Sequence, residues 1–444
     1  AEGTDSWRQR RVVTPARATR RHPVLAPCGM ARCGVVVLAA VTQLVLGQGP
    51  TITHKIGNLT GCDESRSCGA LGAAPWGVGA AAVAFGGGTQ LGPSTVVGRA
   101  DGASESLGEA KRSPPPPPPS ILVDVLDATT LRVTAAPPMP VGHAGDSTSA
   151  ASLMGLTFFC GGGGVVSIWN ASAGAWLEAG PKAAWTIPPR RFLACASVIA
   201  GNGSKGYVVC GGGEGPKGGP DLSGHVDVFE VLASGAGVGQ SVQLLAPSMH
   251  SAPNPAALSQ PRKKAAAAGA ADVLIIATGY SDTGNPTGYS ARFDMFNASS
   301  GAWSSGELPS KAGRQYGAAV GCGGVLIFGG GQIAGGRYGG FDAYHTGTRS
   351  WSTGNLSVPR SNLAAACLGS RYALFAGGQI PGRTTVDMID TATMAVSQLE
   401  PLNYGRGWLV GAGAGKCVAF GGGGSRPADT SNSTYGDLDI YCIV

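Results

Sequence analysis

Residues 340–379, GFDAYHTGTRSWSTGNLSVPRSNLAAACLGSRYALFAGGQ, contain one complete unit of a repeat that recurs along the chain. The unit begins with an alternating strand that ends at Tyr344 and continues through a fixed step to Trp351. A Pro-Arg pair at Pro359, a small-residue strand and an apolar strand closed by two glycines follow. Short runs of this kind, bounded by turn residues, predict four strands per unit.

The apolar strand with its closing glycines recurs seven times, with the first glycine of each copy at Gly86, Gly161, Gly211, Gly279, Gly329, Gly377 and Gly421. A second alternating strand follows each copy, and six of these strands carry Asp two residues before a bulky apolar residue. The seven strands begin at Asp124, Ser167, Asp227, Asp294, Asp342, Asp387 and Asp439. Self-similarity at a fixed period is typical of repeat architectures.

The Gly-Gly doublet, the aromatic strand and the Trp after a constant step resemble the signature of kelch repeats. The resemblance covers roughly residues 51–444 and implies one four-stranded blade per repeat, arranged radially so that no long edge is left open. We therefore expect residues 50–444 to form an all-β, seven-bladed kelch-type β-propeller.

The last repeat reaches Val444 after only its third strand. Residues 53–60, THKIGNLT, match WSTGNLS at residues 351–357 and place His54 in the Trp position. We expect this N-terminal strand to pair with the strand that ends at Tyr441. It would then complete the last blade and close the ring through backbone hydrogen bonds.

The composition of the chain also favours many short strands. It has 74 Gly, 30 Pro and 13% charged residues beside 43% apolar residues, which is turn-rich but has ample material for a core. The net charge is +6, but residues 1–47 hold seven Arg against two acidic residues, so the remaining chain carries only +1. A nearly neutral body argues against nucleic acid as a partner.

Residues 30–49, MARCGVVVLAAVTQLVLGQG, predict a secretory signal peptide and hence a secreted or extracellular protein. The apolar run of about 14 residues is shorter than the roughly 20 that a membrane span needs, so no stable membrane anchor is expected. Residues 1–29 are an unassigned leader. We interpret them as an extension of the gene model, or alternatively as an Arg-rich transit segment that would direct the protein to an organelle lumen.

Residues 92–120 interrupt the first repeat and end in a run of prolines. Such a run favours extended polyproline II over packing, and it predicts a solvated loop insert in the first blade.

Six Asn-X-Ser/Thr sequons occur, and with a signal peptide they predict N-glycosylation at Asn58, Asn170, Asn202, Asn297, Asn355 and Asn432. Asn170 and Asn297 share one repeat position, and Asn58 and Asn355 share another. Turn chemistry is therefore an alternative reason for four of the six.

Nine cysteines follow residue 47, an odd number, so not all of them can pair within the chain. Cys62 and Cys68 lie in a polar loop and are predicted to form a local disulfide in an oxidising compartment. Cys195 and Cys210, which face each other across an expected hairpin, are the second candidate pair. The histidines are scattered singly and no metal-ligand spacing occurs, so neither a metal nor a cofactor is predicted.

The resemblance to binding propellers of the kelch type implies a ligand site on one face, built in part by the loops that lead into the innermost strands. Five arginines share that position, namely Arg190, Arg262, Arg314, Arg360 and Arg406. Repetition around a ring would gather their guanidinium groups for carboxylate, sulfate or phosphate recognition. Two residues further on, Phe192, Tyr316 and Trp408 would add aromatic surface. In the alternative interpretation each Arg only holds neighbouring loops together.

The leading hypothesis is a secreted, non-catalytic, monomeric propeller that binds a protein or an anionic glycan, with no catalytic residue predicted. Two enzyme classes share the fold and remain alternatives: sugar mutarotases or epimerases, and copper oxidases resembling galactose oxidase. A purely structural matrix component is a third class.

Overall fold

The computed structural model describes residues 50–58, 72–76, 82–86, 123–140, 149–161, 164–171, 173–177, 187–201, 203–215, 222–233, 241–245, 257–283, 287–378, 383–423 and 437–444. The expected leader, the signal peptide, the Pro-rich insert, Cys62 and Cys68 lie outside these residues. Within the described ranges the regular elements are all strands, and no helix there has the length and apolarity of a membrane span.

Antiparallel pairing joins these strands into seven four-stranded sheets. The first two sheets contain β2 (Gly72–Trp76), β3 (Ala82–Gly86), β4 (Val123–Asp127) and β5 (Val133–Ala135), and then β6 (Ser149–Leu153), β7 (Leu156–Cys160), β8 (Val166–Asn170) and β9 (Ala175–Trp176). The third and fourth contain β10 (Ala194–Ile199), β11 (Lys205–Gly211), β12 (Val226–Leu232) and β13 (Ser241–Leu245), and then β14 (Ala266–Ala270), β15 (Val273–Ala277), β16 (Arg292–Asn297) and β17 (Ala302–Glu307); the fifth and sixth contain β18 (Ala318–Cys322), β19 (Val325–Gly329), β22 (Gly340–His345) and β23 (Ser350–Asn355), and then β24 (Ala364–Leu368), β25 (Tyr372–Ala376), β26 (Val386–Asp390) and β27 (Ala395–Gln398). The seventh contains β28 (Val410–Ala414), β29 (Cys417–Gly421), β30 (Asp437–Ile443) and, from the N-terminal part of the chain, β1 (Ile52–Asn58).

A separate two-stranded ribbon, β20 (Gln332–Ile333) and β21 (Gly336–Arg337), projects from the loop between β19 and β22. Side chains are described in all four strands of six of the seven sheets. In the β2–β5 sheet they are described only in β4 and β5.

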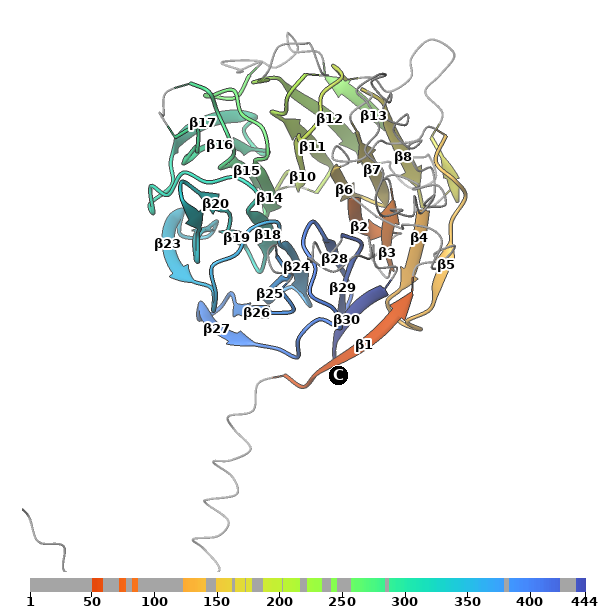
Figure 1. The fold of residues 1–444 in the computed structure, drawn as a ribbon. Coiled ribbons are helices and arrows are strands. Elements are labelled where there is room, and N and C mark those ends of the chain that lie inside the picture. Colours follow the sequence, from red (N-terminus) through yellow and green to blue (C-terminus); the bar gives the residue numbers. More distant parts are fainter. Residues whose placement is uncertain are drawn as a thin grey trace, which may run out of the picture. The chain divides into compact units, whose positions relative to one another are not determined.

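The first strands of the sheets contact one another in a closed cycle, β2 to β6, β10, β14, β18, β24, β28 and back to β2. Figure 1 shows the labelled first strands around the centre, with later strands of each sheet further out. The cycle makes the fold an all-β β-propeller, as the sequence predicted.

Crowding explains why the first strands are rich in Ala and Gly. A Cβ added at Gly321 of β18 would lie 1.9 Å from the carbonyl oxygen of Gly269 in β14, and one at Gly413 of β28 would lie 2.1 Å from that of Cys367 in β24. Larger residues cannot occupy these positions, because backbone of the neighbouring first strand already fills the space. The Ala run before Ala270 is accordingly a strand rather than a helix.

The second strand of each repeat forms the core, because it lies inside its sheet and is covered by the sheets on both sides. All five residues are buried in β7, β15, β19, β25 and β29. The fourth strand β27 is exposed throughout. This gradient follows the apolar run that precedes each Gly-Gly doublet.

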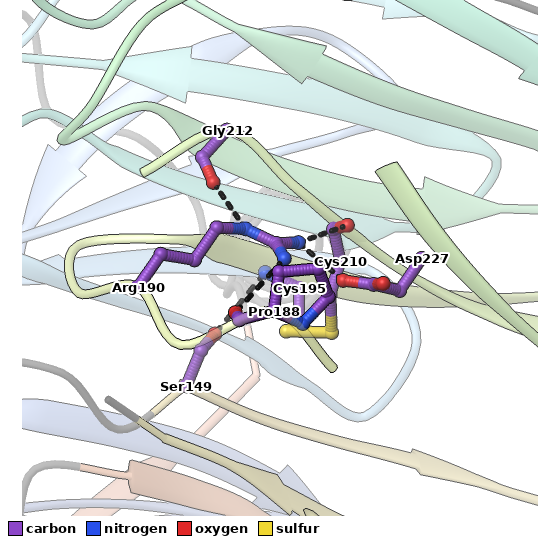
Figure 2. Close-up of a disulfide and its surroundings, with 7 residues drawn as sticks. All are labelled: Ser149, Pro188, Arg190, Cys195, Cys210, Gly212 and Asp227. Atoms are coloured by element: carbon purple, nitrogen blue, oxygen red, sulfur yellow. Dashed lines mark hydrogen bonds and ion pairs between the residues drawn. A yellow bond between two sulfur atoms is a disulfide. The ribbon is translucent and has the colours of Figure 1, made fainter. Parts of the chain in front are cut away.

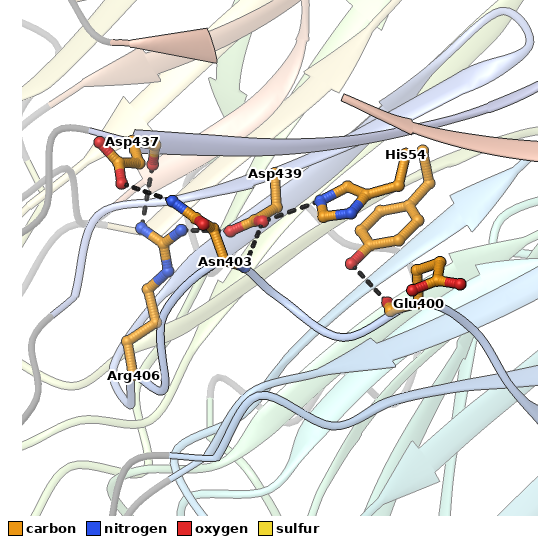
Figure 3. Close-up of polar contacts among 7 residues, drawn as sticks. His54, Glu400, Asn403, Arg406, Asp437 and Asp439 are labelled. Carbon is orange, nitrogen blue, oxygen red and sulfur yellow. Dashed lines mark hydrogen bonds and ion pairs between the residues drawn. The ribbon is translucent and has the colours of Figure 1, made fainter. Parts of the chain in front are cut away.

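The N-terminal strand β1 pairs antiparallel with β30 along its whole length, from Ile52 opposite Ile443 to Asn58 opposite Asp437. His54 lies opposite Tyr441, just as Trp351 lies opposite Tyr344 in a complete repeat. The imidazole of His54 stacks on the Tyr441 ring at 4.5 Å between centroids. Its Nε2 lies 2.9 Å from Oδ1 of Asp439 (Figure 3).

Three disulfides are present among the described residues. Cys195–Cys210 links β10 to β11, and it is the second of the two candidate pairs named from the sequence. Cys322–Cys367 joins the first strands of two neighbouring sheets, and Cys417–Cys442 joins β29 to β30. The sequence analysis predicted neither of the last two pairs.

Candidate ligand-binding face

The five repeated arginines lie on the face of the ring at which the first strands begin, which we call the top face. Each precedes the first residue of its strand by four positions. All five are buried, and Arg262, Arg314, Arg360 and Arg406 are 0% exposed. Each guanidinium group forms an ion pair with the repeated Asp in the third strand of its own sheet, in the pairs Arg190–Asp227, Arg262–Asp294, Arg314–Asp342, Arg360–Asp387 and Arg406–Asp439.

Arg314 illustrates the arrangement. Its Nη2 donates to Oδ2 of Asp342 at 2.7 Å and to the carbonyl of Phe328 at 3.0 Å. Its Nη1 donates to the carbonyl of Ala312 at 3.0 Å. Asp342 also accepts the backbone N–H of Ser310 at 2.9 Å. One buried pair therefore ties the loop before the first strand to the second and third strands.

The pairs at the two ends of this series follow the same plan. Arg190 contacts Asp227 and donates through Nε to the Gly212 carbonyl at 2.7 Å (Figure 2). Arg406 contacts Asp439 and donates through Nη1 to the Asp437 carbonyl at 2.9 Å (Figure 3).

The closing glycines join neighbouring sheets at four junctions among the described residues. The last glycine of the copy donates its N–H to the carbonyl of the Arg in the following sheet, for example from Gly331 to Arg360 at 2.9 Å. The glycine before it, Gly330, adopts φ of +64°, and a Cβ there would lie 2.6 Å from the same Arg360 carbonyl. The left-handed backbone and this close approach both favour glycine, although Thr278 occupies the equivalent position of the β14–β17 sheet with φ of 63°.

These contacts correct the predicted role of the five arginines. Their donors are directed to carboxylates and carbonyls inside the sheets, and burial lowers the pKa of Arg262 while its partner Asp294 opposes that shift. The residues Arg190, Arg262, Arg314, Arg360 and Arg406 are therefore scaffold, as in the alternative interpretation. Burying such cations is tolerated because each has a partner of opposite charge.

The residue two positions after each Arg adopts a left-handed backbone although none of the five is glycine. Their φ values are 57° at Phe192, 57° at Lys264, 55° at Tyr316, 55° at Asn362 and 56° at Trp408. We call these five residues the left-handed arc. A left-handed L-residue costs roughly 1–2 kcal/mol, so the same strain occurs at five equivalent places.

Backbone hydrogen bonds connect the arc from sheet to sheet. The N–H of Lys264 donates to Phe192 O at 3.1 Å and that of Tyr316 to Lys264 O at 3.3 Å. The series continues from Asn362 to Tyr316 O at 2.8 Å and from Trp408 to Asn362 O at 2.9 Å. Of the three aromatic residues predicted to add surface beside the arginines, Trp408 is exposed, and Phe192 and Tyr316 are half-buried.

One part of the top face is basic. The Lys264 ammonium lies over two aromatic rings, 5.2 Å from the Phe192 centroid and 4.6 Å from the Tyr316 centroid. Next to it, Glu214 forms ion pairs with Arg191, whose Nε lies 2.6 Å from Oε1, and with Lys263. Three cations against one carboxylate give this basic sector, Arg191, Lys263, Lys264 and Glu214, a formal charge of 3 − 1 = +2.

The other end of the arc is aromatic and open. Trp408 is 43% exposed and Tyr404, in the same loop, is 45% exposed. Both side chains therefore present ring surface to solvent. The sequence analysis identified Trp408 but not Lys264, because it considered only the aromatic residues among those that follow each Arg by two positions.

A cavity of about 670 Å³ lies at the opposite end of the first strands. It is lined by the hairpin turns that follow β6, β10 and β14, including Met154, Ile199 and Ala271. Its one carboxylate, Asp272, accepts a hydrogen bond from Asn297 Nδ2 at 3.1 Å. Small and apolar side chains dominate this cavity, so it offers little for recognition or catalysis compared with the top face.

The predicted glycosylation sites differ in accessibility. Asn170 is 6% exposed and its Oδ1 accepts the N–H of Ala173 at 3.2 Å, so turn chemistry rather than a glycan accounts for it. Asn297 is half-buried and forms the corresponding bond to Ser300 N. Asn355 is exposed. Only the backbone of Asn58 is described, and Asn202 and Asn432 lie outside the described residues.

Among the described residues, one group has the composition of a metal site, the sulfurs of Cys160, Cys195 and Cys210, and two of these form a disulfide. No protein-family model matches the chain, and no curated protein is significantly similar to it.

Proposed function

We propose that this chain is a secreted kelch-type propeller of seven blades, closed by β1, that binds an anionic glycan on its top face without catalysing a reaction. Seven four-stranded sheets support the blade count, and the pairing of β1 with β30 supports the closure. The disulfides of the propeller agree with a signal peptide and an oxidising compartment.

The left-handed arc carries the proposal. The backbone at its five positions would suit glycine, yet each position holds a large or polar side chain and tolerates the strain. Strained residues of this kind concentrate at binding and catalytic sites, where the surrounding structure holds them in place. The arc therefore holds its side chains on a rigid backbone, with Trp408 exposed and Asn362 buried.

The chemistry of the arc favours an anionic sugar over an apolar peptide. The basic sector supplies a net positive charge for a carboxylate or sulfate, and Trp408 with Tyr404 supplies exposed ring faces on which a pyranose can stack. The two parts lie on different blades, so an oligosaccharide can contact both while a monosaccharide contacts one.

A glycan array of sulfated, sialylated and uronic-acid oligosaccharides, probed with the secreted protein, tests the proposal. We expect binding that weakens with added salt, because the charged contacts are screened. Lys264→Ala should weaken Kd at least tenfold, and Trp408→Ala should do the same, whereas Lys416→Ala, an exposed lysine in the turn between β28 and β29, should not. Absence of binding to every anionic glycan, or equal loss with Lys416→Ala, contradicts the proposal. Turnover of a bound sugar would favour the enzyme alternatives.

A further inference from the structure

A cluster of three sulfurs lies in the junction between the β6–β9 and β10–β13 sheets. The Sγ atoms of Cys160, Cys195 and Cys210 are all within 4.8 Å of one another and all three residues are buried. Cys195 and Cys210 form a disulfide, and Cys160 is a free thiol. Figure 2 shows the disulfide beside Arg190 and Asp227.

Comparison with other junctions shows that Cys160 faces Cys210. In the β6–β9 sheet, Cys160 of the second strand pairs with the first residue of the first strand. Gly211 and Gly329 occupy the equivalent second-strand position in the sheets that begin with β10 and β18. A Cβ at Gly211 would lie 2.6 Å from Ile276 Cδ1, and one at Gly329 would lie 2.7 Å from Phe375 Cε1. In the sheet that follows each of these glycines, Ile276 and Phe375 come one residue before the equivalent second-strand position. In the sheet that follows Cys160, the residue one before that position is Cys210.

The junction is therefore built differently from its counterparts. At the two junctions compared above, a bulky apolar side chain fills the space against a glycine, and here three cysteines fill it. Hydrogen bonds fix the backbone around them, since Cys195 N–H donates to Ser149 Oγ at 3.1 Å and Arg190 Nη2 donates to the Cys210 carbonyl at 3.3 Å. Ser149 is itself the residue that lies opposite Cys160.

We propose that Cys160, Cys195 and Cys210 form a disulfide-exchange site, in which the bond moves from Cys195–Cys210 within one sheet to Cys160–Cys210 between two sheets. The Cys160 thiolate attacks Cys210 Sγ, the new S–S bond forms, and the Cys195–Cys210 bond breaks with its electron pair on Cys195 Sγ. Cys195 then takes up a proton equivalent to the one that Cys160 lost. The exchange needs no external oxidant or reductant, and it joins two neighbouring sheets covalently.

Burial keeps the resting bond in place. It raises the pKa of the Cys160 thiol far above its ordinary value, the nearby Asp227 carboxylate adds to that rise, and Arg190 opposes it. The thiolate needed for attack is therefore scarce at neutral pH, and the exchange is slow unless the junction opens. An inter-sheet bond already exists elsewhere in the ring, between Cys322 and Cys367.

Disulfide mapping of a cysteine variant tests the site directly. Cys195→Ser, treated with oxidised glutathione and then alkylated under denaturing acid conditions, should yield a Cys160–Cys210 peptide with neither cysteine alkylated. The Cys322–Cys367 and Cys417–Cys442 peptides report that the variant is folded. Recovery of both Cys160 and Cys210 as alkylated thiols, with those two disulfides intact, overturns the proposal.

The wild-type protein provides a test that does not depend on the folding of a variant. After incubation at pH 9 and an acid quench, a fraction of molecules should show Cys195 alkylated together with a Cys160–Cys210 peptide. Cys160→Ser, in which exchange cannot occur, should show no alkylation of Cys195 under the same conditions. Wild-type protein in which only Cys160 is ever alkylated overturns the proposal.

Discussion

Replacement of Arg314 by Ala separates a scaffold arginine from a ligand-binding one. The change removes a fully buried cation and leaves Asp342 as a buried carboxylate that keeps only its contacts to Ser310. It also leaves the carbonyls of Phe328 and Ala312 without their guanidinium donor. Breaking a buried ion pair by removing one partner typically costs about 3–5 kcal/mol.

That cost converts into a measurable shift of the melting temperature. For the propeller body, Ile52–Val444, an unfolding entropy of about 2.1 cal/mol/K per residue gives roughly 0.8 kcal/mol/K, so Tm should fall by about 4–6 °C. Differential scanning calorimetry of the secreted protein measures this directly. Arg371→Ala is the matched control, because that arginine also pairs with an aspartate but its side chain is 52% exposed, and its Tm should stay near wild type.

The double variant Arg314→Met with Asp342→Leu refines the interpretation. An apolar pair of similar volume removes the unpaired charge, so most of the lost stability should return. If Arg314→Ala leaves Tm unchanged, the guanidinium group is not committed to the sheet, and the assignment of the five arginines to the scaffold is refuted.

Three further outcomes follow from the described contacts. Deletion of residues 50–58 removes the partner of β30 and exposes its edge, so we expect aggregation in light scattering and a lower Tm, and an unchanged Tm would contradict the role of β1. Burial alone raises the pKa of Asp439, but hydrogen bonds from His54 and Asn403 N–H, together with Arg406, hold this pKa below the ordinary 3.8. The lowered pKa stabilises the folded state above about pH 4, and this stabilisation should be lost as the pH falls below 3.8. Urea titrations at several pH values should show the loss in the wild type but not in Asp439→Asn. Lys311 is an exposed left-handed residue with φ of 51°, so Lys311→Gly should raise Tm by about 1 °C through relief of roughly 1 kcal/mol of strain, and a decrease would show that the left-handed backbone carries no such cost.

The sequence predicted the fold well because the residues that determine it are the repeated ones. The Gly-Gly doublets, the apolar second strands and the match that placed His54 opposite Tyr441 all reflect local rules of backbone geometry and period. The all-β propeller is confirmed on these grounds.

The site was harder to predict because repetition was interpreted as function. The sequence contained the evidence for a scaffold role, since an Asp recurs in the third strand of each sheet whose first strand follows a repeated Arg. In the β6–β9 sheet both are missing, with Gly145 four residues before the first strand and Ser167 in the Asp position. The β2–β5 sheet, however, keeps Asp124 although Cys68 stands four residues before its first strand, so the pairing and its burial could only be seen in three dimensions.

The repeated Arg and the residue two positions later have different roles on the top face. Five arginines with five aspartates and the Gly-Gly doublets fix one backbone path into each sheet, down to nearly equal φ values in the left-handed arc. On that constant path the side chain changes from Phe192 to Lys264, Tyr316, Asn362 and Trp408. A position under purely structural constraint would repeat its residue, as the arginines do. Variation of the side chain on an unvarying backbone is the condition for recognising an irregular ligand, and it is for this reason that we place the binding surface on the arc rather than on the arginines beneath it.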